Sequence, residues 1–175
     1  MEKLETVRVA LGYEVGPDCV VVSIGEQKMA VFRDRVPTMI FDVSTSRAAP
    51  SCVKESLGTP TGLHRIAEKI GAGAPPGMVF KARRPTERYQ DMPGSATTDN
   101  LITSRILWLD GLEEGRNRGG DRDTKARYVY IHGTNQEAKL GTPNSHGCVL
   151  LSNADVIRVF DCLAVGTLVW IDDDR

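Results

Sequence analysis

Short runs rich in β-branched residues, each ended by glycine, proline or a polar turn, limit what this chain can fold into more than any other feature. None of these runs has the length and the apolar spacing of a long helix, so the pattern predicts a mainly β fold. The expected strands are Val7–Tyr13, Cys19–Ile24, Lys28–Arg33, Thr38–Val43, Leu63–Ala67, Ile102–Leu109, Arg127–Ile131 and Thr167–Ile171.

One segment near the C-terminus has helical spacing instead. Ser152 is a candidate N-cap, and Asp155 follows three residues later as in a capping box. Apolar residues then repeat at a period of about 3.6 residues, which predicts an amphipathic helix that ends by Gly166. These residues are Val156, Ile157, Phe160, Leu163 and Ala164.

Composition narrows the classes of function. The 175 residues are consistent with a single domain over residues 1–175, and a net charge of −1 gives no basic excess for a nucleic-acid partner. There is no apolar run of the roughly 18 residues that a membrane-spanning helix needs. Met1–Leu11 has no apolar stretch followed by a small-residue cleavage site, so no signal peptide is visible there.

The residues around Cys148 form the pattern that most favours a catalytic site, because this cysteine follows Ser145-His146-Gly147. His132 lies sixteen residues upstream, at the end of an expected strand. A cysteine nucleophile needs a base or cation that favours the thiolate, and donors for the oxyanion of its intermediate. His132 is the candidate base, and the Gly133 carbonyl is the nearest acceptor to fix its tautomer. The backbone N–H groups of residues 146–148 are expected to converge on the oxyanion.

The other cysteines have no such surroundings. Cys19 and Cys162 lie in apolar runs and are expected to be buried and inert, and no CxxC pair occurs among the four cysteines. A zinc site built from His132, His146 and Cys148 is an alternative, although no fourth ligand is evident and the last two lie too close together in the chain.

Two segments together carry a family resemblance: Tyr130-Ile131-His132-Gly133-Thr134-Asn135 and Gly141-Thr142-Pro143-Asn144-Ser145-His146-Gly147-Cys148-Val149. This histidine-glycine pair, followed by a spacer and Ser-His-Gly-Cys, resembles the signature of the YkuD family of L,D-transpeptidases. Thr59-Pro60-Thr61-Gly62 is similar to another recurrent segment of that family.

The resemblance implies a β-sandwich of mixed sheets with one helix after the cysteine. It implies a peptidoglycan L,D-transpeptidase of the bacterial cell envelope or periplasm that needs no cofactor. Its cysteine would form a thioester with a tetrapeptide stem, release D-alanine and pass the acyl group to an amine, giving 3→3 cross-links. Carbapenem-type β-lactams would acylate the same sulfur. The implied catalytic residues are Cys148, His132 and Gly133, and the implied oxyanion and substrate-binding residues are Ser145, His146, Gly147, Tyr130 and Asn135.

One position departs from the family pattern. Two residues after the cysteine the family carries Arg or Asn, and this chain has Leu150. The same cysteine and histidine would also serve an L,D-carboxypeptidase in which water resolves the thioester, and Leu150 keeps open a peptidoglycan-binding module without turnover.

Three further expectations concern single features. Residues 85–100 are interpreted as a surface segment that is either a lid or a plain loop. Alternation along Arg127–Ile131 predicts that Tyr128, Tyr130 and His132 share one face of a strand. His64 is expected to be a structural or surface residue.

Overall fold

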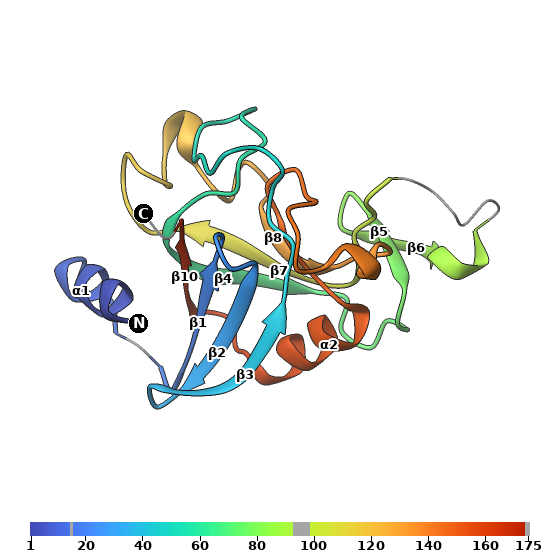
Figure 1. Ribbon diagram of the computed structural model, residues 1–175, viewed down its shortest axis with the longest axis horizontal. Helices are drawn as coiled ribbons and strands as arrows, with labels where there is room; N and C mark the ends of the chain where they lie inside the picture. Colours follow the sequence, from blue (N-terminus) through green and yellow to red (C-terminus); the bar gives the residue numbers. More distant parts are fainter. Residues whose placement is uncertain (15, 93–98, 174–175) are drawn as a thin grey trace.

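The computed structural model describes residues 1–14, 16–92 and 99–173 of the chain (Figure 1). The strands are β1 (Asp18–Ser23), β2 (Lys28–Arg33), β3 (Val36–Asp42), β4 (Gly62–Ile70), β5 (Met78–Lys81), β6 (Arg84–Arg88), β7 (Thr103–Gly111), β8 (Tyr130–Gly133), β9 (Val149–Leu151) and β10 (Leu168–Asp172). The helices are α1 (Glu2–Ala10) and α2 (Asn153–Cys162), with short 3-10 turns at Tyr89–Asp91, Gly120–Arg122 and Glu137–Lys139.

The strands form one hydrogen-bonded sheet of ten strands in the order β3-β2-β1-β10-β4-β7-β5-β6, with β8 added against β7 and β9 against β8. Two neighbouring pairs, β1 with β10 and β8 with β9, are parallel, and the other pairs are antiparallel. The predicted mainly β fold with a mixed sheet is therefore confirmed, although the strands join into one sheet.

The sheet curls around its main hydrophobic core. One buried cluster contains residues of β1, β2 and β3 together with residues of β7, β8, β9 and α2. The chain just after β3 also pairs with β9, because Ser44 and Leu150 exchange backbone hydrogen bonds of 3.1 and 2.8 Å. The sheet therefore closes at a seam between residues 44–46 and β9, and both ends of the sheet contribute to one core.

The predicted helix after the cysteine is present as α2. Its N-cap is Ser152, whose Oγ accepts the N–H of Asp155, and its buried face carries Val156, Val159 and Phe160. The helix ends at Cys162, earlier than expected, because Leu163 has an extended backbone and Gly166 follows with φ of 92°. Within the described residues, no helix is both long enough and apolar enough to cross a membrane.

Two strand predictions were wrong. The chain around Val7 is the end of α1 rather than a strand, because Leu4 is fully buried and Val7 packs beside it, one helical turn away. Glu2 and Glu5 near its start and Arg8 near its end also suit the helix dipole. Likewise, β8 begins only at Tyr130, because Tyr128 has φ of 57°, which is outside the β region.

Candidate active site

The two faces of the β8–β9 pair have different surroundings. Ile131, Val149 and Leu151 point into the main core, whereas Tyr130 and Cys148 belong to a separate cluster with Phe80 and Ile106. Side chains alternate along a strand, so His132 lies on the Tyr130 face and Leu150 on the Cys148 face. The parallel register sets His132 opposite Leu150. Alternation and register therefore indicate that His132, the candidate base, and Cys148, the candidate nucleophile, lie on the same side of the sheet.

His132 is held in one orientation. It is 3% exposed, and its Nδ1 lies 2.8 Å from the carbonyl oxygen of Gly133. A carbonyl can only accept, so Nδ1 carries the proton and Nε2 is left as the acceptor. Burial lowers the pKa of the imidazole to about 4, which the hydrogen bond to Gly133 only partly offsets. The ring is therefore neutral at neutral pH.

Cys148 is half-buried and its sulfur contacts backbone groups. The N–H of Tyr130 points at Sγ over 3.4 Å, and the thiol donates to the carbonyl of Tyr128 over 3.7 Å. Burial raises the pKa of the thiol to about 11, while the Tyr130 N–H and the charge of Arg127 lower it. Among the described residues, no hydrogen bond joins this sulfur to the imidazole of His132.

The pKa values differ from the expected state of the pair. A thiolate stabilised by an imidazolium was predicted, but both burial effects favour the uncharged forms. The resting site thus holds a thiol and a neutral imidazole. The neutral ring is the form that can take a proton from sulfur, so the geometry supports a general base rather than an ion pair.

A tight turn presents the cysteine. Ser145 is buried, and its Oγ donates to the carbonyl of Cys148 over 2.6 Å and accepts the N–H of Gly147 over 3.1 Å. Gly147 has φ of 130°, and a Cβ there would lie 3.4 Å from the Gly58 carbonyl oxygen. The Gly147 N–H is therefore already bonded, which differs from the expected convergence of three N–H groups. The N–H groups of His146 and Cys148 have no acceptor among the described residues.

Close packing around the residue after His132 requires a glycine at position 133. A Cβ at this position would lie 2.7 Å from the Thr103 carbonyl oxygen and 3.1 Å from Asn153 Oδ1. Asn153, at the start of α2, accepts from Thr103 and Ser104 and donates to the carbonyl of Thr134. This buried network joins β7, the end of β8 and α2, and so fixes the backbone that carries His132.

Aromatic rings form one wall beside the sulfur. Tyr130 makes an edge contact with His132 at 6.4 Å between ring centroids and another with Trp108 at 5.5 Å. Tyr128 lies 5.6 Å from Trp108, and the guanidinium of Arg83 lies over both of those rings. Arg83 belongs to the turn between β5 and β6, so that hairpin reaches the wall. Most of the expected 85–100 lid segment is described, but residues 93–98 lie outside the described residues.

The remaining candidates take different places. Asn135 accepts the N–H of Leu101 and donates to the carbonyl of Asp99, so both of its amide atoms bind the backbone of residues 99–101. His146 is exposed, and its Nε2 lies 2.7 Å from Nη2 of Arg47. His64 is fully buried beside Gly62 and Thr124, which agrees with a structural residue.

Sequence reasoning missed Arg127. Its guanidinium donates to the carbonyls of Ser51 and Gly58, and its positive charge lowers the pKa of Cys148. The Gly58 carbonyl is the group that approaches Gly147. No local motif marks Arg127, because its partners lie about 70 residues away in the chain.

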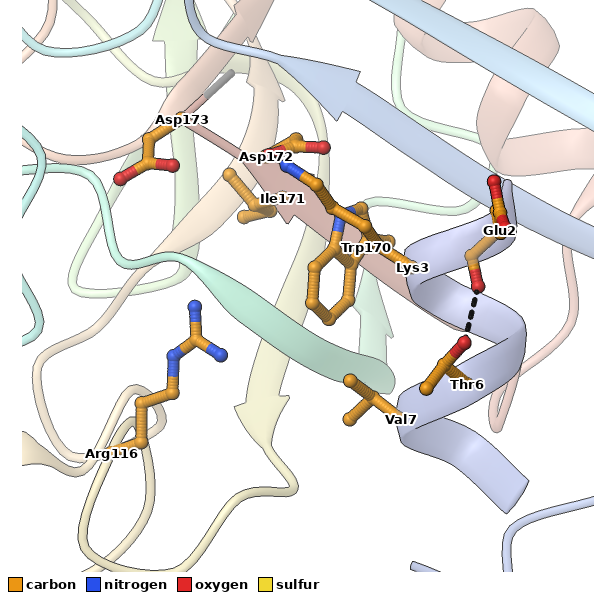
Figure 2. A pocket seen from close by; sticks show the side chains of 9 residues that line it. All are labelled: Glu2, Lys3, Thr6, Val7, Arg116, Trp170, Ile171, Asp172 and Asp173. Carbon is orange, nitrogen blue, oxygen red and sulfur yellow. Dashed lines mark hydrogen bonds and ion pairs between the residues drawn. The ribbon is translucent and has the colours of Figure 1, made fainter. Parts of the chain in front are cut away.

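Within the described part of the chain, no three His, Cys, Asp or Glu side chains are grouped so that they could hold a metal ion. The zinc alternative needed His146 as a ligand, but the Nε2 atom of that ring faces the cation Arg47. A cavity of about 490 Å³ lies elsewhere, between α1 and the end of β10 (Figure 2). Its lining includes Val7, Arg116 and Trp170 but none of the candidate catalytic residues.

Comparisons with known proteins identify the family of the chain. The chain matches the YkuD family, described as the L,D-transpeptidase catalytic domain, over residues 17–171. It is 32% identical over 98 residues to a Bacillus subtilis (strain 168) protein provisionally named L,D-transpeptidase YqjB. This alignment covers 56% of the chain and 49% of that protein, so the chain spans about half of this relative.

Solved structures share the fold at low identity. An L,D-transpeptidase from Mycobacterium smegmatis has a TM-score of 0.53 at 18% identity, over 89% of this chain and 58% of that one. L,D-transpeptidase 3 from Mycobacterium tuberculosis, in complex with a faropenem-derived adduct, has a TM-score of 0.57 at 16% identity, over 90% and 60%. The motif, the fold and the match over most of its length show that this chain belongs to the YkuD family of L,D-transpeptidase catalytic domains.

Proposed function

We propose that this protein is a cysteine acyltransferase that joins peptidoglycan stem peptides by L,D-transpeptidation. The observation that carries the proposal is the placement of Cys148 and His132 on one face of β8–β9, with His132 Nε2 kept free by the Gly133 carbonyl. A half-buried thiol on the same face as a base of fixed tautomer is an arrangement that suits nucleophilic acyl transfer. Residues 1–175 would act as one catalytic domain in the bacterial cell envelope.

The first half-reaction starts from the uncharged pair. The Cys148 thiol turns from the Tyr128 carbonyl, gives its proton to His132 Nε2, and its sulfur attacks the carbonyl of the third residue of a tetrapeptide stem. The resulting imidazolium then protonates the amine of the leaving D-alanine as the C–N bond breaks, and a thioester remains on Cys148. No cofactor enters this step, because the residues present supply the nucleophile and the base.

The second half-reaction reverses the same proton movement. An amine of a second stem attacks the thioester, His132 takes the proton from that amine, and the sulfur leaves and regains a proton. The N–H groups of His146 and Cys148 are the proposed oxyanion donors in both halves. Ser145 and Gly147 would shape this segment, Tyr130 would line the site, and Asn135 would act by holding residues 99–101.

A carbapenem tests the nucleophile directly. Intact mass measured after incubation should show one adduct on the native protein, which Cys148→Ala should lose and Cys162→Ala should keep. Cys162 is the matched control because it is a half-buried thiol of helix α2. The faropenem-derived adduct of the Mycobacterium tuberculosis relative supports the use of a β-lactam as the probe. An adduct that persists in Cys148→Ala would contradict the proposed nucleophile.

Tetrapeptide-bearing wall fragments then separate the outcomes of the thioester. Mass spectrometry should find cross-linked dimers that contain both stems and have lost one D-alanine. Tripeptides without dimers would show an L,D-carboxypeptidase, in which water resolves the thioester. Fragments left unchanged by a protein that also resists the carbapenem would favour a binding module.

A further inference from the structure

A polar cavity of about 460 Å³ opens beside His146, two residues before Cys148. Arg47 and Lys139 contribute positive charges to its lining, and Asp99 contributes one negative charge. The other lining groups include the side-chain amides of Asn100 and Asn144. The cavity therefore has excess positive charge and several neutral hydrogen-bonding groups.

Arg47 is mounted on the seam that closes the sheet. Ser46 and Ser145 form an isolated bridge, and the N–H of Arg47 donates to the carbonyl of Ser145 over 3.2 Å. The Arg47 side chain reaches His146, with Nη2 2.7 Å from Nε2. A guanidinium can only donate, so His146 Nε2 accepts and its proton lies on Nδ1. The backbone bridge thus fixes a cation next to the segment that carries the nucleophile.

The charges of Arg47 and Lys139 are not neutralised by any residue that the structure describes. Neither side chain has a carboxylate partner among residues 1–14, 16–92 and 99–173. One Arg47 donor is used by His146, and the others remain free to bind a ligand. A guanidinium pairs with a carboxylate through parallel hydrogen bonds, and an ammonium adds a point charge. The cavity therefore matches a planar anion.

We propose that this cavity binds a free carboxylate of the peptide substrate, with Arg47 and Lys139 as the groups that recognise it. This inference rests on the proposed function, since it takes the occupant to be a stem peptide. The carboxylate belongs to the third residue of the stem, taken here to be a diamino acid, in either the donor or the acceptor peptide. The two sources differ in which half-reaction they affect. Arg47 and Lys139 are specificity-determining residues for that peptide.

Matched peptides test the proposal: a tetrapeptide stem whose diamino acid carries a free carboxylate, and the same peptide with that group amidated. Arg47→Met should raise KM for the free acid about tenfold, the loss expected for one charged hydrogen bond, and leave the amide unchanged. Lys139→Met should act in the same direction. Arg35→Met is the charge-matched control at the β2–β3 turn, and should change neither KM. An equal effect on both peptides would overturn the proposal.

The half-reaction that Arg47→Met slows identifies whether the carboxylate belongs to the donor or the acceptor stem. A donor carboxylate would slow thioester formation in Arg47→Met, followed by intact mass. An acceptor carboxylate would leave thioester formation unchanged and raise only the KM of the amine peptide. Alkylation of Cys148 by iodoacetamide, which is small and uncharged, should proceed at the native rate in both variants and shows that the nucleophile is intact.

Binding without turnover keeps the inference separate from the proposed function. Calorimetry with Cys148→Ala protein should show tighter binding of the free-acid peptide than of the amide, and adding Arg47→Met should abolish that difference. If Cys148→Ala protein shows this difference and Arg47→Met abolishes it, while the native protein forms no thioester, the transpeptidase proposal fails and the carboxylate site stands. A difference that persists in Arg47→Met would refute the role of Arg47. Equal binding of both peptides to Cys148→Ala protein would refute the carboxylate site.

Discussion

The uncharged state of Cys148 and His132 determines how the site can react. The thiol has a pKa of about 11 and the imidazole a pKa of about 4, so a thiolate–imidazolium pair is strongly disfavoured before substrate binds. In the proposed reaction the proton therefore moves while sulfur attacks the carbonyl. Groups that change the pKa of either partner then change the rate, and Leu150 and Arg127 are the two residues that the structure places to do so.

Leu150 is expected to affect the pKa of His132, the candidate base. It is 1% exposed and lies opposite His132 in the parallel register. We infer from this register that its apolar side chain adds to the burial that lowers the imidazole pKa. Leu150→Asn should raise that pKa, because an amide stabilises the charged ring better than a hydrocarbon does. The acidic limb of the pH profile for carbapenem acylation should move to higher pH. Leu150→Met, which stays apolar, is the control, and an equal shift in both variants would contradict this account.

Arg127 affects the pKa of Cys148, the candidate nucleophile. Arg127→Met removes a positive charge that lowers the pKa of Cys148, so the thiolate fraction at pH 8 should fall. Iodoacetamide alkylation should slow by roughly threefold to tenfold, which corresponds to a rise of half to one pKa unit. Arg127→Lys keeps the charge but loses the paired bonds to Ser51 and Gly58. If alkylation of the Arg127→Lys variant is also slow, the hydrogen bonds to Ser51 and Gly58, and not the positive charge, determine the reactivity of Cys148.

At the scale of elements, sequence reasoning succeeded where the signal was local. Alternation and β-branching predicted β1, β2 and β4, and the Ser152 cap predicted the start of α2. The spacer after His132 returns the chain so that β9 forms next to β8. His132 then lies opposite Leu150, two residues after Cys148.

Sequence reasoning failed where distant contacts decide. Val7 and Val9 favour a strand by propensity, but burial of Leu4 against residues of β1, β4 and β10 stabilises a helix instead. Tyr128 alternates with Tyr130 in sequence, yet its positive φ ends that alternation. Arg47 reaches His146 only because residues 44–46 close the sheet against β9. The spacing of residues along the chain does not indicate that the sheet closes in this way.

The capping of α2 can be tested alone. Ser152 Oγ lies 3.0 Å from the N–H of Asp155, which would otherwise be an unsatisfied donor at the start of the helix. Ser152→Ala should lower the free energy of unfolding by about 1 kcal/mol in urea denaturation. Ser152→Asn supplies another good cap and should recover most of the loss. A loss that Asn does not restore would mean that Ser152 acts by its packing.

At the scale of the whole molecule, closure of the sheet joins the stability of the core to the chemistry of the site. His132 is buried on the face of β8 that also carries Tyr130, and a second histidine, His64, is fully buried on β4. Burial lowers the pKa of each ring to about 4, and folding therefore requires that both rings be neutral. The same burial that makes His132 a neutral base makes the fold sensitive to acid.

Acid sensitivity has a definite sign and range. Above pH 6.5 both histidines are neutral in the folded and unfolded chains, so they contribute no pH dependence. Between pH 6.5 and about 4 the unfolded chain binds protons that the folded chain does not, and the free energy of unfolding falls. Each ring can contribute a loss of up to about 3 kcal/mol over this range. Acid therefore destabilises the protein before most carboxylates titrate.

Urea denaturation at pH 7.0, 6.0 and 5.0 measures this loss, and a His64→Gln variant isolates one ring. Gln cannot take a proton, so the variant should be less stable than the native protein at pH 7 but lose less stability on acidification. The difference in slope should approach 1.4 kcal/mol per pH unit, the value for one proton. Glu5 and Asp123 have lowered pKa values and act mainly below this window, since their ordinary values are 4.5 and 3.8. Parallel slopes would show that His64 takes its proton in the folded protein, which would require the core around β4 to open at mild acidity.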